Sequence, residues 1–191
     1  MSRLPQNQLM RILVLSLILS LALTAAFAQD DRPPDAAYCE EQGGTVVTRY
    51  PATNTNNADI LPFAGTVDFC EWHDVEEAGI ASLPVSVLYA DMPTLAALIY
   101  RNPPIYEPGG SPGANPSYAY CDQLGGAIAF GAANASGSGW VNEDDPSDVI
   151  SVCVFADGSM MESFTLFYKS DGTIRGADLT ERLRWDDSAE S

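Results

Sequence analysis

Basic residues are scarce in this chain: nine Lys and Arg stand against 26 Asp and Glu among 191 residues, for a formal charge of −17. An acidic surface repels phosphate backbones and anionic lipid headgroups, which excludes nucleic-acid binding and argues against a peripheral membrane binder. Histidine occurs only as His73, and the nearest two of the four cysteines are 31 positions apart. A zinc site needs more closely spaced ligands, so we predict no metal and no other cofactor.

Long apolar runs are also absent, apart from one near the start. Ile12 to Leu23 is too short to span the roughly 30 Å core of a bilayer as a helix. It follows Arg3 and Arg11 and precedes Ala26-Phe27-Ala28, the small-x-small pattern that signal peptidase recognises. We therefore expect a signal peptide over residues 1–28, and a mature chain that is secreted or periplasmic without stable membrane insertion. Cleavage removes two arginines and no acid, which changes the formal charge from −17 to −19.

An exported chain with an even number of cysteines is expected to form disulfides, because the compartment is oxidising. Four cysteines allow three connectivities, and an internal repeat selects one of them. Three stretches recur in the same order: YCEEQGG at 38–44 with YCDQLGG at 120–126, CEWHD at 70–74 with CVFAD at 153–157, and LIY at 98–100 with LFY at 166–168. One bridge within each copy then gives Cys39–Cys70 and Cys121–Cys153.

Each copy predicts the order helix, strand, strand, helix, and therefore an α+β fold of two tandem modules with one disulfide each. Asn115-Pro116-Ser117 and Pro33-Pro34-Asp35 are typical helix starts, and the Gly-Gly pairs are typical helix ends. We expect strands at 45–50, 66–72, 127–130 and 149–155, and a helix at 160–168. Leu83 to Tyr89 is compatible with an added edge strand, and Ala177 to Trp185 with a short helix.

The spacing of the repeats sets the domain boundaries. The third match has the smaller offset, which indicates about 15 extra residues in the first copy. The expected units are residues 1–28 as signal peptide, 29–100 as the first module with an insertion at about 75–89, 101–114 as a Pro/Gly linker, 115–174 as the second module, and 175–191 as a tail with an acidic end. Because the linker is rich in proline and glycine, we expect the second module to fold independently.

The repeated residues resemble a known family. They are similar to the small exported bacterial module catalogued as domain of unknown function 333, whose members are often labelled hemolysins; the matching residues are Asn115-Pro116-Ser117, Tyr120-Cys121, Gly125-Gly126, Cys153-Val154-Phe155 and Asp157-Gly158-Ser159. Many members carry a further cysteine pair in and after the last helix, where this chain has none. The resemblance implies the compartment, fold and disulfides, but no catalytic residue. The lytic label has little physical support, because a pore former needs a segment that enters lipid.

Candidate sites are few. His73 beside Asp74 suggests a general base, but the second copy has Ala156 in place of His73, which favours a solvated turn residue. Asp74 and Asp157 recur in the two copies, as turn formation explains. Tyr38 and Tyr120 mark either a binding face or packing beside each disulfide.

An acidic cluster, Glu143-Asp144-Asp145 with Asp148, offers oxygen ligands for calcium. It lacks the alternating ligand spacing of a calcium loop, so a solvated acidic loop is the simpler interpretation. The sequence contains no nucleophile elbow, phosphate-binding loop or nucleotide fingerprint.

These observations predict an exported, disulfide-stabilised, non-enzymatic protein that binds a protein or cell-envelope component. One alternative is a protease-inhibitor-like protein, which needs a rigid exposed loop between the cysteines; Asn54 to Asp59 is polar and predicts a flexible one. Another alternative is an enzyme with an unrecognised site, which requires a cleft between the modules, converging acids and a perturbed pKa.

Overall fold

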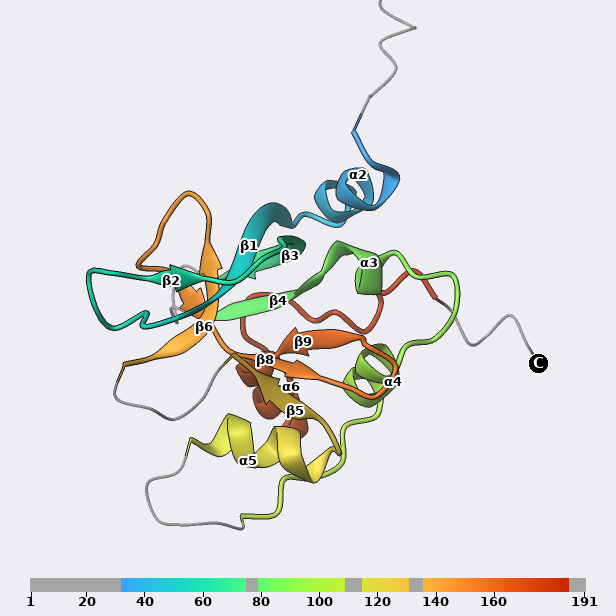
Figure 1. The fold of residues 1–191 in the computed structure, drawn as a ribbon. Helices are drawn as coiled ribbons and strands as arrows, with labels where there is room; N and C mark the ends of the chain where they lie inside the picture. Colours follow the sequence, from blue (N-terminus) through green and yellow to red (C-terminus); the bar gives the residue numbers. More distant parts are fainter. Residues whose placement is uncertain (1–31, 75–78, 109–114, 131–135, 186–191) are drawn as a thin grey trace, which may run out of the picture. The chain divides into compact units, whose positions relative to one another are not determined.

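The computed structural model describes residues 32–74, 79–108, 115–130 and 136–185, so the expected signal peptide and the end of the tail lie outside the described residues. The fold is α+β (Figure 1). The helices are α2 (Pro34–Glu41), α3 (Val85–Leu88), α4 (Leu95–Arg101), α5 (Pro116–Gln123) and α6 (Ser163–Ser170). The strands are β1 (Thr45–Thr53), β2 (Leu61–Pro62), β3 (Val67–His73), β4 (Ile80–Pro84), β5 (Ala127–Ala129), β6 (Ser138–Asn142), β7 (Val149–Ile150), β8 (Val152–Val154) and β9 (Met160–Glu162).

The strands form two antiparallel sheets. The larger has the order β4-β3-β1-β6-β7 with β2 also paired to β1, and the smaller has the order β5-β8-β9. β6 lies beside β1 in a register that runs from Arg49↔Asn142 to Thr53↔Ser138 (Figure 1). The larger sheet therefore contains strands from both halves of the chain, and this pairing does not fit a second module that folds alone.

Both disulfides link the first helix of a copy to its second strand. Cys39 in α2 is bonded to Cys70 in β3, and Cys121 in α5 to Cys153 in β8, each with a Cα–Cα distance of 5.7 Å. These are the pairs expected from the repeat. All four cysteines belong to one hydrophobic core cluster that also contains Leu179 and Leu183 of the tail. Closing loops of this length stabilises a fold by about 3–4 kcal/mol each in the chain-entropy model.

The two glycines after each first helix have different tasks. Gly43 and Gly125 have φ values of +79° and +76°, which favour glycine at a helix C-terminus. Gly44 and Gly126 lie directly against the bridges: a Cβ on Gly126 would come within 2.5 Å of Cys153 Sγ and 3.0 Å of Cys121 Sγ. The second glycine of each pair is therefore required by the close approach of a disulfide.

The edge strand expected at Leu83 to Tyr89 is wrong, because most of this segment is helical. The strand β4 ends at Pro84, and the helix α3 begins at Val85. The same order occurs in the second copy, where β9 pairs with β8 and leads into α6. Cys70 pairs with Leu83 as Cys153 pairs with Met161, over separations of 13 and eight residues. The first copy therefore has five extra residues between its second cysteine and the paired residue of the next strand, and not the expected 15 or so. The LIY stretch at 98–100 lies in α4, a helix that has no counterpart in the second copy.

Three other expected elements are also corrected. The helix expected from Met160 begins only at Ser163, because the preceding residues pair with β8 and Glu162 caps the helix. The strand expected at 149–155 is divided at Ser151 between β7 and β8, which belong to different sheets. Ala177 to Trp185 forms turns instead of a helix, with Leu179 and Leu183 buried.

The described part of the expected linker, up to Pro108, is packed onto the second copy. Pro104 accepts a hydrogen bond from the Tyr120 hydroxyl at 2.6 Å. Tyr106 contacts the rings of Tyr120 and Phe167, with centroid distances of 5.9 and 5.2 Å. This part is therefore an ordered cover and not a free spacer.

Candidate functional site

The larger sheet holds a buried ion cluster around Arg49. The side chains of Arg49 and Glu71 are fully buried and joined by two contacts, Nε–Oε1 at 2.6 Å and Nη2–Oε2 at 3.0 Å. Arg49 Nη2 also donates to Asp148 Oδ2 at 2.7 Å, and Nη1 donates to the carbonyls of Trp140 and Asp148. All five N–H groups of the guanidinium are thus used. Burial lowers the pKa of Arg49, but the bonds to Glu71 and Asp148 outweigh it and raise the pKa.

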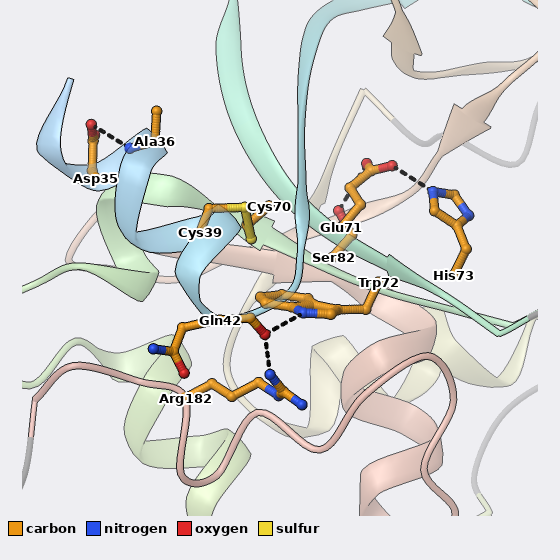
Figure 2. The surroundings of a disulfide bond; sticks show 10 residues. All are labelled: Asp35, Ala36, Cys39, Gln42, Cys70, Glu71, Trp72, His73, Ser82 and Arg182. Carbon is orange, nitrogen blue, oxygen red and sulfur yellow. Dashed lines mark hydrogen bonds and ion pairs between the residues drawn. A yellow bond between two sulfur atoms is a disulfide. The ribbon is translucent and has the colours of Figure 1, made fainter. Parts of the chain in front are cut away.

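Glu71 extends this cluster toward the surface and toward α6. Ser82 Oγ donates to Glu71 Oε1 at 3.1 Å, and His73 Nε2 lies 3.4 Å from Glu71 Oε2 (Figure 2). The side chain of His73 is 60% exposed at the end of β3. The predicted solvated residue is therefore a surface neighbour of a buried carboxylate.

A second buried carboxylate, Glu162, caps α6. It accepts hydrogen bonds from Phe164 N at 2.8 Å, Thr165 N at 2.6 Å and Thr165 Oγ1 at 2.9 Å. Burial raises the pKa of Glu162 to about 7; the helix hydrogen bonds oppose this rise, and the charge of Glu71 adds to it. Ser82 N donates to Thr165 Oγ1 at 3.1 Å, so a polar network connects the two carboxylates.

Beside Glu162 the surface contains a hollow of about 270 Å³. It is lined by Gly79, Ile80, Val149, Ile150, Ser151, Glu162, Phe164, Tyr168 and Arg175. The Arg175 guanidinium lies 3.9 Å from the centre of the Tyr168 ring. Its Nε is buried and has no hydrogen-bond partner among the residues that the structure describes.

A second hollow of about 380 Å³ adjoins the first, and Val149 and Ser151 line both. The second hollow is lined by Thr55, Asn56, Tyr118, Gly137, Ser138, Ser147, Val149 and Ser151. The hydroxyls of Tyr118 and Ser151 are hydrogen-bonded at 2.7 Å where the hollows meet. We refer to the two hollows together as the groove.

The acidic residues at 143–148 do not act as one cluster, because they contact different partners. Asp148 belongs to the ion cluster of Arg49, whereas Asp145 accepts hydrogen bonds from the backbone and hydroxyl of Ser147. Within the described ranges, no group of three or more His, Cys, Asp and Glu side chains is placed to hold a metal ion. Asp157 accepts from Ser159 and also from Leu95 N at 2.7 Å, so it holds the start of α4 as well as its own turn.

The two tyrosines beside the disulfides are covered by distant segments. Tyr120 is buried beneath Pro104, and the Tyr38 hydroxyl donates to the Arg182 carbonyl at 3.1 Å. Near the first bridge, Trp72 Nε1 and Arg182 Nη1 both donate to the Gln42 carbonyl, so the tail is fastened to the end of α2 (Figure 2).

The loop at Asn54 to Asp59, expected to be flexible, is hydrogen-bonded at both ends. Asn54 N donates to the Gly137 carbonyl at 2.8 Å, and Asn56 N to the Ser136 carbonyl at 2.9 Å. Asn54 Nδ2 closes the loop onto the Asp59 carbonyl at 2.7 Å. These bonds fix one wall of the groove.

Sequence reasoning missed both the ion cluster and the groove. The single signal for the cluster is Arg49 within a strand, an unusual residue there unless it finds a buried acid. The groove gives no local signal, because its residues come from many separate stretches between Thr55 and Arg175.

The chain matches no family model, no curated protein and no solved structure. Among the helices of the described residues, none has the length and apolar character needed to cross a membrane.

Proposed function

We propose that this protein is an exported, non-catalytic binding protein, built from two tandem α+β modules, that binds a protein or cell-envelope component in the groove. The observation that carries the proposal is the groove itself: residues of both copies line each of its two hollows, and Val149 and Ser151 line both. Binding sites are commonly concave and lie between structural units.

Matched contacts in the two copies support the tandem arrangement. Tyr38 lies near Tyr89 and Tyr120 near Phe167, with ring centroids 5.4 and 6.3 Å apart. The segment that follows each copy covers the other copy: Pro104 accepts from Tyr120, and Arg182 from Tyr38. Such a reciprocal exchange is the pattern of a two-fold dimer whose subunits have become one chain.

Two disulfides support export, because such bonds persist in oxidising compartments. A binding role is favoured over an enzymatic one by the contacts of the buried acids. Glu162 has the raised pKa expected of an acid–base group, but its oxygens accept from the start of α6. Glu71 is likewise engaged by Arg49 and Ser82. Both carboxylates therefore serve the fold.

The test is retention of material from a cell-envelope extract on the immobilised mature protein. Ser147 is exposed on the groove wall, so Ser147→Trp fills the second hollow. Ser86→Trp is the matched control, because Ser86 is exposed on α3 and does not line the groove. We expect the wild type and Ser86→Trp to retain the same component and Ser147→Trp to lose it. Equal retention by all three proteins places binding elsewhere, and no retention by any of them rejects the proposed function.

A further inference from the structure

We propose that the ligand of the groove is a saccharide chain. This inference rests on the proposed function, because it names the chemical class that the same site recognises. It is carried by the chemistry of the two hollows. The second hollow is lined by hydrogen-bonding groups, which match the hydroxyl groups at the edge of a sugar ring, and the first is lined mainly by apolar groups, which match the C–H groups on its face.

The second hollow is lined by neutral hydrogen-bonding groups. Its polar side chains are hydroxyls and one amide: Thr55, Asn56, Tyr118, Ser138, Ser147 and Ser151. None of the described residues that line this hollow is charged, although the chain has a formal charge of −17. Hydroxyl and amide groups both donate and accept, as sugar hydroxyls do. A cationic ligand would instead be matched by carboxylates, and an anionic one by basic residues.

The hydroxyl pair at the junction is prepared to contact a ligand. Tyr118 and Ser151 share one hydrogen bond of 2.7 Å, which uses the proton of only one of them. The other proton and the remaining lone pairs can bond a ligand hydroxyl. Because Ser151 lines both hollows, this pair can contact a chain that occupies the whole groove.

The first hollow provides mainly apolar surface, and its polar side chains are Ser151, Glu162 and Arg175. Phe164 and Tyr168 stack with ring centroids 5.8 Å apart and planes inclined by 25°, and Ile80 and Val149 complete the apolar wall. The C–H face of a sugar ring packs on such a surface. The Arg175 guanidinium also lines this hollow, and its N–H groups are donors for a hydroxyl or a substituent carbonyl.

A bound peptide is less compatible with the same groove. Peptides that add to a sheet need a free edge with several main-chain partners. The edge strand β7 has only two residues, Val149 and Ile150, and the next carbonyl, that of Ser151, already accepts from Ser163 N at 2.8 Å.

The experiment is a screen of the full mature protein against an array of oligosaccharides two to six residues long, with neutral peptides of similar length as comparison. A bound oligosaccharide is then titrated by amide NMR. We expect shifts at Ser151, Tyr118 and Arg175, and an affinity about tenfold lower for Tyr118→Phe, the effect of one lost hydrogen bond. Ser86→Ala should bind like the wild type. Binding of peptides alone, or of no oligosaccharide at millimolar concentration, overturns the proposal.

Treatment of the envelope extract separates this inference from the proposed function. Periodate cleaves the vicinal diols of a saccharide, and glycosidases cut chains that lack such diols, such as 1,4-linked 2-acetamido sugars. One of these two treatments should abolish retention of a saccharide, whereas protease treatment should leave it unchanged. Retention that is sensitive to protease and resistant to periodate and glycosidases keeps the binding function and rejects the saccharide. If untreated extract is not retained, both fail together.

Discussion

Arg49 and Glu71 form a two-point ion pair inside the larger sheet, on the neighbouring strands β1 and β3, with both side chains fully buried. Removing one partner of such a pair leaves an uncompensated buried charge, whereas replacing both with apolar residues does not. The two kinds of change are therefore expected to differ in their effect on the free energy of unfolding.

We predict that Arg49→Met lowers the free energy of unfolding by about 3–5 kcal/mol, measured by urea denaturation under non-reducing conditions. The cost arises because Glu71 and Asp148 lose their shared partner. The double variant Arg49→Met with Glu71→Met should be less destabilised than the single one. An equal or larger loss in the double variant would show that shape, and not charge, dominates at this site.

The buried carboxylate of Glu162 predicts an unusual dependence of stability on pH. Its pKa is raised from 4.5 to about 7, so the folded state binds the proton more tightly than the unfolded state. The free energy of unfolding should therefore fall as pH rises from about 4.5 to 7, by on the order of 3 kcal/mol, and then level off. Asp178 affects stability only at lower pH, because its pKa is lowered to about 2. Partial burial raises this pKa, but the hydrogen bonds from Thr180 and Lys169 lower it by more.

The measurement is urea denaturation across this pH range for the wild type and Glu162→Gln. Glutamine keeps an oxygen that accepts from the backbone of α6 but does not titrate, so its curve should lack the decline between pH 4.5 and 7. The same decline in both proteins would assign it to other groups.

Local elements of this fold could be predicted because their causes are local. Asn115 before Pro116, and a glycine at positive φ after a helix, act within one turn of the chain. The disulfide pairs followed from the repeat of the cysteines with their neighbours. The third repeat match was misleading, because LIY in α4 resembles LFY in α6. Since Leu83 is the counterpart of Met161, the counterpart of Leu166 is Leu88 of α3 and not Leu98 of α4.

The groove and the ion cluster could not be predicted, because they depend on contacts between the two halves. Nothing near Tyr50 indicates that its strand pairs with Val141. Glu162 had the appearance of an ordinary surface residue in a helix, and only the pairing of β9 with β8 places it at a buried helix start. Long-range strand pairing leaves little trace in a single sequence.

The pairing of β6 with β1 predicts that the two halves fold together. Residues 109–191 expressed alone in an oxidising compartment should lack dispersed amide signals, because Trp140 and Ile150 lose their contacts with Phe69 and β1. Co-expression with residues 29–108 should restore a folded complex that contains both disulfides. A well-dispersed spectrum from the second half alone would instead support independent modules.

The net negative charge of the chain and the ion pair between Asp148 and Arg49 predict that this protein does not lyse membranes. The chain has nine basic and 26 acidic side chains, and cleavage of the expected signal peptide would remove two of the basic ones, Arg3 and Arg11; such an acidic chain is repelled by anionic lipid. Calcium could bridge acidic loops to headgroups, but Asp148 is held by Arg49, which leaves Glu143, Asp144 and Asp145 as the exposed acids of that loop. We expect no co-sedimentation with anionic vesicles and no dye release at physiological salt, with calcium or with chelator. Release in both conditions would restore the lytic label, and binding with calcium alone, abolished by Asp144→Asn, would make the loop a cation site.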